Sequence, residues 1–209
     1  MKKPRFDSVI FDMDGTLWDA VDTYRDIWNT AYQAMGVDAR VTRRQLLECM
    51  GMTLDRIAAK LNPPDIDTRR FYNEIRKADD LLMPRQGGIL YPGVKEMLPS
   101  LASQFRLFMV SNCGDKGLDY FLDFTGLRPY FTDLRSYGAT LKLKDINIRD
   151  LCREYSLSSP IYVGDTDGDC RSAHAAGVPM IHVTYGFGRC NDAEFQASSF
   201  AEVVDSLYV

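Results

Sequence analysis

The sequence lacks several features that would assign it to a specialised class of protein. Its five cysteines are odd in number and include no C-x-x-C pair, which argues against a disulfide framework or a zinc site. The formal net charge is −4, so the basic excess typical of nucleic-acid-binding proteins is missing. We therefore expect no nucleic-acid partner.

Long hydrophobic runs are missing as well. The opening Met-Lys-Lys resembles the start of a signal peptide, but the apolar run that follows is only Val9–Phe11, and Asp12 and Asp14 interrupt it. No segment is long enough to span a membrane. We expect a cytoplasmic protein with no membrane partner. Because no feature requires an oligomer, we expect a monomer.

Short apolar segments typical of strands occur near the start of the chain and, in alternation with helical segments, in its second half. The first, Ser8–Phe11, is a short β-branched run typical of a buried parallel strand. Further strands are predicted at Phe105–Val110, Pro160–Val163 and Met180–Val183, with helices at Leu118–Phe124, Asn147–Tyr155, Asp169–Ala176 and Ser199–Leu207. Alternation of this kind indicates an α/β fold with an open, Rossmann-like parallel sheet.

A block without a convincing strand separates the first strand from the glycines at 87 and 88. Its apolar spacing predicts four helices: Asp22–Met35, one that starts at the Thr42–Gln45 capping box, Thr53–Leu61 and Thr68–Met83. We interpret residues 17–86 as an all-helical cap domain. It is inserted into a sheet core made of residues 1–16 and 87–209. The chain length of 209 residues suits one core domain with an insertion.

Polar side chains follow three of the predicted strands. These residues are Asp12, Asp14, Ser111, Asn112, Asp165, Asp167 and Asp169. In open α/β sheets, ligands bind beyond the carboxyl ends of the strands. Clustered carboxylates repel one another unless a cation joins them, and a set of oxygen ligands favours Mg²⁺. Such a site suits phosphoryl transfer, in which a carboxylate can act as nucleophile.

Three segments in order resemble the motifs of the haloacid dehalogenase superfamily. Its D-x-D-x-T signature corresponds to Asp12-Met13-Asp14-Gly15-Thr16, its second motif to Ser111-Asn112, and its G-D-x-x-x-D motif to Gly164-Asp165-Thr166-Asp167-Gly168-Asp169. The resemblance covers nearly the whole chain. The helical block resembles the cap of phosphoglycolate phosphatases and β-phosphoglucomutases.

The resemblance implies a role for each carboxylate. Asp12 would be the nucleophile and a ligand of Mg²⁺. Asp14 would be the general acid and base, with its backbone carbonyl on the metal. Asp165 would be a further metal ligand, and Asp169 would orient the ligands or the lysine. Asp167 is interpreted as a helix cap or a surface charge.

The phosphate-binding lysine departs from the family pattern. Relatives often have Lys-Pro ahead of a helix, whereas this chain has Lys142-Leu143-Lys144 and no proline. Lys144 lies three residues before Asn147, the expected helix cap, and is the preferred candidate. Lys142 is the alternative.

Other residues are expected to contact the substrate. The resemblance implies that Ser111 and Asn112 bind the phosphoryl group. It also suggests that the loop around Gly51 faces the site and that Arg56 contacts the substrate.

The predicted activity is Mg²⁺-dependent hydrolysis of a small phosphomonoester, such as phosphoglycolate or a sugar phosphate, through an aspartyl-phosphate. The alternatives are a β-phosphoglucomutase-like phosphomutase and a catalytically idle binding protein. A dehalogenase is disfavoured because Asp14 is present where dehalogenases lack a carboxylate. Trp18 and Tyr24, near the predicted hinge, are candidates to reach a ligand.

Overall fold

The computed structural model describes residues 3–209, and its centre is a six-stranded sheet. The strand order is β5-β4-β1-β6-β7-β8, and every neighbouring pair is parallel. The strands are β1 (Ser8–Phe11), β4 (Arg106–Ser111), β5 (Asp133–Ser136), β6 (Pro160–Gly164), β7 (Met180–Val183) and β8 (Phe195–Ala197). This topology confirms the predicted Rossmann-like α/β fold.

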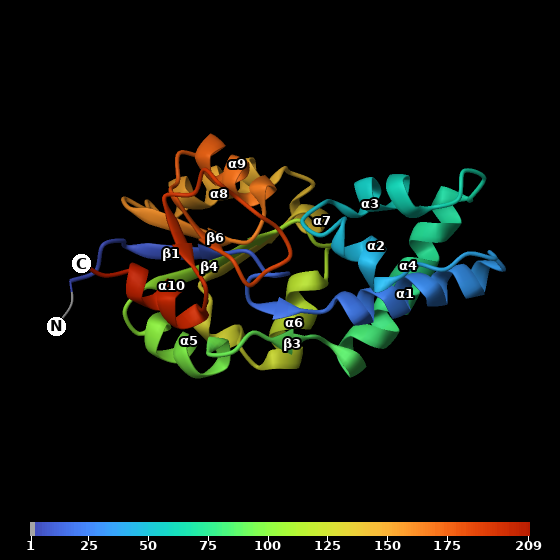
Figure 1. Ribbon diagram of the computed structural model, residues 1–209, viewed down its shortest axis with the longest axis horizontal. Helices are drawn as coiled ribbons and strands as arrows, with labels where there is room; N and C mark the ends of the chain where they lie inside the picture. Colours follow the sequence, from blue (N-terminus) through green and yellow to red (C-terminus); the bar gives the residue numbers. More distant parts are fainter. Residues whose placement is uncertain (1–2) are drawn as a thin grey trace.

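Helices cover both faces of the sheet, which explains why its central strands are apolar throughout (Figure 1). Val9 and Phe11 face one core cluster, and Ile10 between them faces the other. The first cluster includes α5 (Val94–Ala102), α6 (Gly117–Thr125) and α10 (Phe200–Ser206), and the second includes α8 (Lys144–Glu154) and α9 (Asp167–Ala175). The short helices η1 (Arg128–Tyr130) and α7 (Tyr137–Thr140) flank β5.

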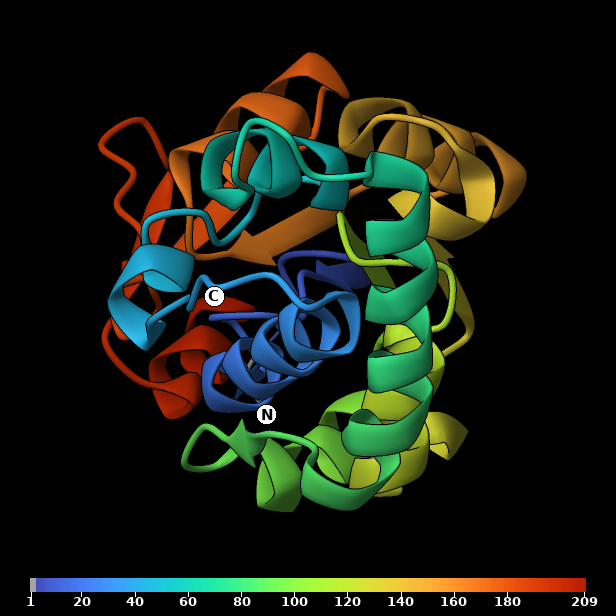
Figure 2. The same ribbon diagram turned by 90° about the vertical axis from the view of Figure 1, so that its right-hand side faces the viewer.

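Four helices form a lobe at one end of the molecule, beyond the sheet and far from the C-terminus (Figures 1 and 2). This helical lobe consists of α1 (Val21–Met35), α2 (Arg43–Leu47), α3 (Leu54–Leu61) and α4 (Thr68–Gln86). The rings of Trp28 and Tyr32 on α1 lie 5.2 and 5.8 Å from that of Phe71 on α4. Within residues 3–209, no helix has the length and apolar character needed to cross a membrane.

Two very short strands connect the helical lobe to the sheet. β2 (Trp18–Asp19) pairs antiparallel with β3 (Ile89–Leu90), so that the outgoing and returning segments lie side by side. A Cβ atom at Gly88 would lie 2.6 Å from the Trp18 ring, so only glycine allows this approach. The expectation of no strand between residues 17 and 86 was wrong for β2, because two residues carry no periodic signal.

The expected helix cap at Asn147 was also wrong. α8 begins at Lys144, with Leu143 at the N-cap position, and Asn147 lies one turn inside the helix. Its buried side-chain amide donates to the carbonyl of Lys142, at 3.1 Å. The side chain therefore fixes the loop before the helix, which places Lys144 in the first turn.

Candidate active site

Neighbouring strands bring the predicted site residues to one edge of the sheet. β1 lies between β4 and β6, and all three run in the same direction. Asp12 directly follows β1, Ser111 ends β4 with Asn112 after it, and Asp165 follows β6. Because parallel strands end at the same edge, these side chains converge there.

A buried lysine links two of the carboxylates. Lys144 Nζ lies 2.9 Å from Asp12 Oδ1 and 2.5 Å from Asp169 Oδ1, and all three side chains are almost fully buried. Lys142 lies at the surface and pairs with Asp150 at 2.7 Å. Of the two candidate lysines, Lys144 is therefore the one that reaches the carboxylate cluster.

The charges in this cluster shift its acid–base equilibria in different directions. Burial, opposed by the positive charge of Lys144, raises the pKa of Asp12 to about 6. Burial and the nearby charges of Asp169 and Asp12 raise the pKa of Asp165 well above its usual range. Burial would also raise the pKa of Asp169, but the charge of Lys144 and hydrogen bonds from Lys144 and Thr166 outweigh it, so that this pKa is lowered.

The same cluster fits a hard divalent cation. Asp12, Asp165 and Asp169 each offer an oxygen, and these oxygens lie within 4.8 Å of one another. Asp165 Oδ2 accepts from the Phe187 N–H at 2.7 Å, but Asp165 Oδ1 is buried and has no hydrogen-bond partner among residues 3–209. A buried carboxylate oxygen without a donor is costly unless a cation meets it. An all-oxygen set of this kind suits Mg²⁺.

Metal binding should therefore be visible in thermal stability. At Mg²⁺ concentrations about 100-fold above the dissociation constant, binding stabilises the fold by about 2.7 kcal/mol, which corresponds to a Tm increase of roughly 5–10 °C. We expect this increase for the metal-free wild type and for Asp167→Asn, because the Asp167 side chain is exposed and pairs with Arg171. Asp165→Asn should show little or none. An equal increase in that variant would rule out Asp165 as a ligand.

Asp14 lies apart from this cluster and is held by two aromatic side chains. Its Oδ1 accepts from Trp18 Nε1 at 2.9 Å and from the Tyr24 hydroxyl at 3.0 Å. Burial and the charge of Asp12 raise the pKa of Asp14 to about 7, against these two hydrogen bonds. A carboxyl group with this pKa can both donate and accept a proton near neutral pH. The predicted contact of Asp14 with the metal involves its backbone carbonyl, not this side chain.

The hydrogen bond from Tyr24 should affect the pH dependence of the reaction. The bond stabilises the ionised carboxylate, so Tyr24→Phe should raise the pKa of Asp14 further and move the corresponding limb of the kcat profile to higher pH. We also expect about a 10-fold loss in kcat/KM, since one hydrogen bond that orients the carboxyl is lost. Tyr32→Phe is the matched control, because its hydroxyl bonds to Asn62 inside the helical lobe. A profile unchanged by Tyr24→Phe would contradict this role.

The second motif contacts the helical lobe. Ser111 is buried at the end of β4, and its Oγ lies 3.4 Å from the Cys113 nitrogen. The side-chain amide of Asn112 donates to the carbonyl of Gly51 at 2.8 Å. Gly51 has a φ of +82°, and a Cβ there would lie 3.2 Å from Thr166 Cγ2. The loop around Gly51 therefore rests directly on the carboxyl edge of the sheet, where it was expected to face the site.

Arg56 is positioned differently from the other candidates. It is exposed on α3 and lines an outer cleft, which Asn112, Lys144, Arg171 and Arg189 also line. It is absent from the lining of the cavity beside Asp12.

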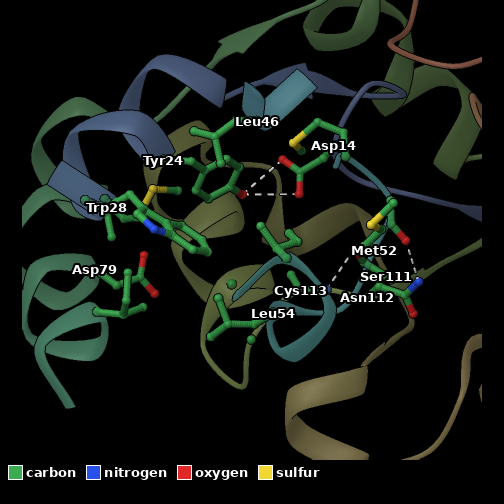
Figure 3. Close-up of a pocket in the computed structure, with 18 of the residues that line it drawn as sticks. Asp14, Tyr24, Trp28, Leu46, Met52, Leu54, Asp79, Ser111, Asn112 and Cys113 are labelled. Carbon is green, nitrogen blue, oxygen red and sulfur yellow. Dashed lines mark hydrogen bonds between the residues drawn. The ribbon is translucent and has the colours of Figure 1, made fainter. Parts of the chain in front are cut away.

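A cavity of about 140 Å³ separates the sheet edge from the helical lobe (Figure 3). Asp12, Asp14, Ser111 and Lys144 form its polar end. Its remaining walls are mostly apolar side chains of the lobe, which include Ile27, Trp28, Leu46, Met50, Leu54, Ile57, Ile75 and Met83. Asp79 of α4 also lines it, and burial together with the neighbouring charges of Asp80 and Asp115 raises its pKa to about 7.

Sequence reasoning assigned the Gly51 loop and Arg56 of the helical lobe to the site, but it missed other contributions of the lobe. Trp18 and Tyr24 were considered only as possible ligand contacts, whereas both hold Asp14. Asp79 and Trp28 were not considered as site residues. The contacts of Trp18 and Tyr24 with Asp14 and the approach of α4 all depend on tertiary packing, which local sequence patterns do not show.

Known proteins provide an independent comparison. The sequence model of the haloacid dehalogenase-like hydrolase family matches residues 9–183. A phosphoglycolate phosphatase of Synechococcus elongatus is 30% identical over 86% of this chain and 84% of its own length. One from Vibrio parahaemolyticus is 26% identical over 96% of each chain.

Solved structures agree in fold. A haloacid dehalogenase-like family protein from Streptococcus pneumoniae superposes with a TM-score of 0.84 at 19% identity, covering 96% of this chain and 98% of its own. A predicted phosphoglycolate phosphatase from Haemophilus somnus also has a TM-score of 0.84, at 21% identity and 96% and 97% coverage. Together with the family match over residues 9–183, the motifs at the ends of β1, β4 and β6 show that this chain belongs to the haloacid dehalogenase-like hydrolase family.

Proposed function

We propose that this enzyme is a Mg²⁺-dependent phosphatase that hydrolyses a small phosphomonoester through an aspartyl-phosphate on Asp12. The observation that carries the proposal is the buried group of Asp12, Lys144, Asp165 and Asp169, of which Asp12 and Lys144 line the cavity. The group combines a nucleophilic carboxylate, a fixed positive charge and an unsatisfied carboxylate oxygen, which are the elements that phosphoryl transfer requires.

The proposed reaction has two steps. Asp12 is the nucleophile of the first step and the leaving group of the second, and Asp14 acts first as acid and then as base. An oxygen of Asp12 attacks phosphorus, and the bond to the leaving oxygen breaks as Asp14 donates its proton to that oxygen. Asp14, now ionised, then removes a proton from water, which attacks phosphorus and releases Asp12 and inorganic phosphate. A pKa of about 7 suits Asp14 to both tasks.

Other residues would bind and neutralise the phosphoryl group. Lys144 would supply positive charge close to Asp12, and Ser111 and Asn112 would donate hydrogen bonds to phosphoryl oxygens. Mg²⁺, held by Asp12, Asp165 and the Asp14 carbonyl with Asp169 beside it, would neutralise charge on the transferred group. The position of Arg56 in the outer cleft suggests that it contacts substrate on its way to the cavity.

We propose that residues 17–86 act as a cap that closes over the substrate. Support comes from the Asn112–Gly51 hydrogen bond and from Tyr24, a lobe residue that bonds to Asp14. Closure would exclude bulk water and orient the general acid in one movement. The partner would be a small phosphorylated metabolite bound by a cytoplasmic monomer.

Phosphate release from phenyl phosphate and a panel of phosphometabolites, with and without Mg²⁺, tests the proposal. The curated relatives are named phosphoglycolate phosphatases, so phosphoglycolate belongs in the panel together with sugar phosphates. We expect Mg²⁺-dependent release and, after acid quenching, an acid-stable, hydroxylamine-labile phosphoprotein. The absence of release from every ester, with or without Mg²⁺, would refute the proposal.

A further inference from the structure

The cavity beside Asp12 has almost no positive charge for a second anionic group. Among the described residues, Lys144 is the one cationic side chain that lines it, and Asp12 and Asp169 already pair with that lysine. Asp14 and Asp79 add carboxyl groups to the walls. A leaving group with its own carboxylate or second phosphate would be buried among like charges without a counterion, which is strongly unfavourable.

The arginines of the neighbouring cleft do not change this balance. Arg56, Arg171 and Arg189 line the outer cleft and not the cavity. The loop around Gly51 lies between the two spaces, because it hydrogen-bonds to Asn112 and contributes lining to both. These arginines can attract an anionic ester to the opening, but they cannot pair with a leaving group inside the cavity.

The far end of the cavity offers one unused donor and one carboxyl group. Trp28 is 4% exposed, and its buried Nε1–H meets no acceptor at full hydrogen-bond geometry within residues 3–209; the Tyr32 hydroxyl, which donates to Asn62, is the polar group that lies near it. Figure 3 shows Trp28 and Asp79 at the end of the cavity away from Ser111 and Asn112. A buried donor without an acceptor is destabilising, so Trp28 favours a ligand that brings an acceptor to this end.

A hydroxyl group fits this pair better than an ammonium group does. A hydroxyl oxygen can accept from Trp28 Nε1–H and donate its own proton to Asp79. An ammonium group can only donate, and would leave the indole N–H unsatisfied. The walls between the two ends are apolar, which suits a hydrocarbon segment. A volume of about 140 Å³ matches an occupant of a few carbon atoms, since an engineered cavity of about 150 Å³ in another protein holds benzene.

We propose that the substrate is the phosphate monoester of a small uncharged alcohol that carries a second hydroxyl group at the end remote from the phosphate. Trp28 and Asp79 bind that hydroxyl, and the apolar lobe residues bind the carbons between. The inference rests on the proposed phosphatase function and narrows its substrate class. It also sets this chain apart from its relatives that are named phosphoglycolate phosphatases, because phosphoglycolate is an ester with a carboxylate on its leaving group.

Four three-carbon phosphate esters that differ only at the distal end test the proposal. They are propyl phosphate, 3-hydroxypropyl phosphate, 3-aminopropyl phosphate and 3-phosphooxypropionate, with 2-phosphoglycolate added. We expect kcat/KM for the hydroxyl ester to exceed that for the propyl and amino esters by about 10-fold, and that for both carboxylate esters by about 100-fold. Trp28→Phe and Asp79→Asn should each reduce the ratio of kcat/KM for the hydroxyl ester over that for the propyl ester from about 10 to about 1, whatever their effect on propyl phosphate turnover itself. Asp65→Asn, at an exposed carboxylate in the loop before α4 that does not line the cavity, is the control.

The outcomes separate this proposal from the phosphatase function. If phenyl phosphate and all five esters fail to release phosphate, the phosphatase proposal fails. In that case, the dissociation constants of the same esters from the Asp12→Asn protein, measured by calorimetry, still test which distal group the cavity prefers. Equal or better use of a carboxylate ester overturns the substrate class, as does a hydroxyl preference that survives both Trp28→Phe and Asp79→Asn. Loss of carboxylate-ester turnover in Arg56→Ala alone would assign the leaving group to the outer cleft.

Discussion

Replacing Asp12 by Asn should lower kcat/KM for phosphate release by roughly 10⁴-fold or more, because the amide cannot form the acyl phosphate. The fold should survive, since Asn still offers an oxygen to Lys144, which lies 2.9 Å from Asp12 Oδ1. Initial rates with phenyl phosphate, measured on protein of unchanged circular dichroism, provide the test.

The control for this variant is Asp167→Asn, in the G-D-x-x-x-D segment. The Asp167 side chain is exposed and pairs with Arg171, so its charge should be dispensable for the reaction. A residual rate in Asp12→Asn above about one-tenth of wild type would show that the nucleophile is another group, since loss of a nucleophile costs several orders of magnitude.

Replacing Lys144 by Met should destabilise the protein by about 3–5 kcal/mol, because removal of one partner from a buried charge cluster leaves the others uncompensated. Asp12 and Asp169 both lie within hydrogen-bonding distance of Lys144 Nζ, and both are almost fully buried. The expected fall in Tm is about 6–20 °C for a chain of this size. Urea unfolding without metal measures the loss in the free energy of unfolding directly.

Lys142→Met is the matched control for Lys144→Met. Lys142 pairs with Asp150 at the surface, and such a pair contributes about 0–1 kcal/mol. The double variant Lys144→Met with Asp169→Asn should recover part of the lost stability, because one of the two unpaired carboxylates is gone. Equal effects of the two single lysine variants would contradict the assignment of Lys144 to the buried cluster.

The sequence predicted the centre of the fold well, because buried parallel strands and amphipathic helices carry strong periodic signals. β1 and β7 have the expected bounds, and α1, α3 and α4 differ from them by at most three residues at either end. The two edge strands of the sheet were missed. β5 contains Asp133 and Arg135 and is half-exposed, and β8 has only three residues, so neither forms an apolar run. α5 was missed because Pro92, Gly93 and Pro99 read as breakers of regular structure.

The same physical reason separates the site residues that the sequence predicted from those that it did not predict. Residues at the end of a strand or directly after it were predictable, because the strand fixes where they point, and Asp12, Ser111 and Asp165 are of this kind. Lys144 was preferred on the basis of a helix cap at Asn147 that does not exist, yet it reaches Asp12 because α8 begins three residues earlier than expected. Contacts across the two lobes, such as that of Tyr24 with Asp14, depend on packing that local patterns do not encode.

The pairing of β2 with β3 has a consequence for how such enzymes diversify. Trp18 is opposite Leu90 and Asp19 is opposite Ile89, so the helical lobe departs from and returns to the sheet through a single two-stranded stem. A lobe attached in this way, here residues 20–88 between β2 and β3, is an exchangeable cassette. Another segment with adjacent ends could replace it, and the order of the sheet strands would not change. Asp12, Lys144 and Asp165 all lie outside the stem, whereas Tyr24, Trp28 and Asp79 lie within the cassette. Recombination at the stem would therefore exchange the walls of the cavity and leave the reacting carboxylates in place.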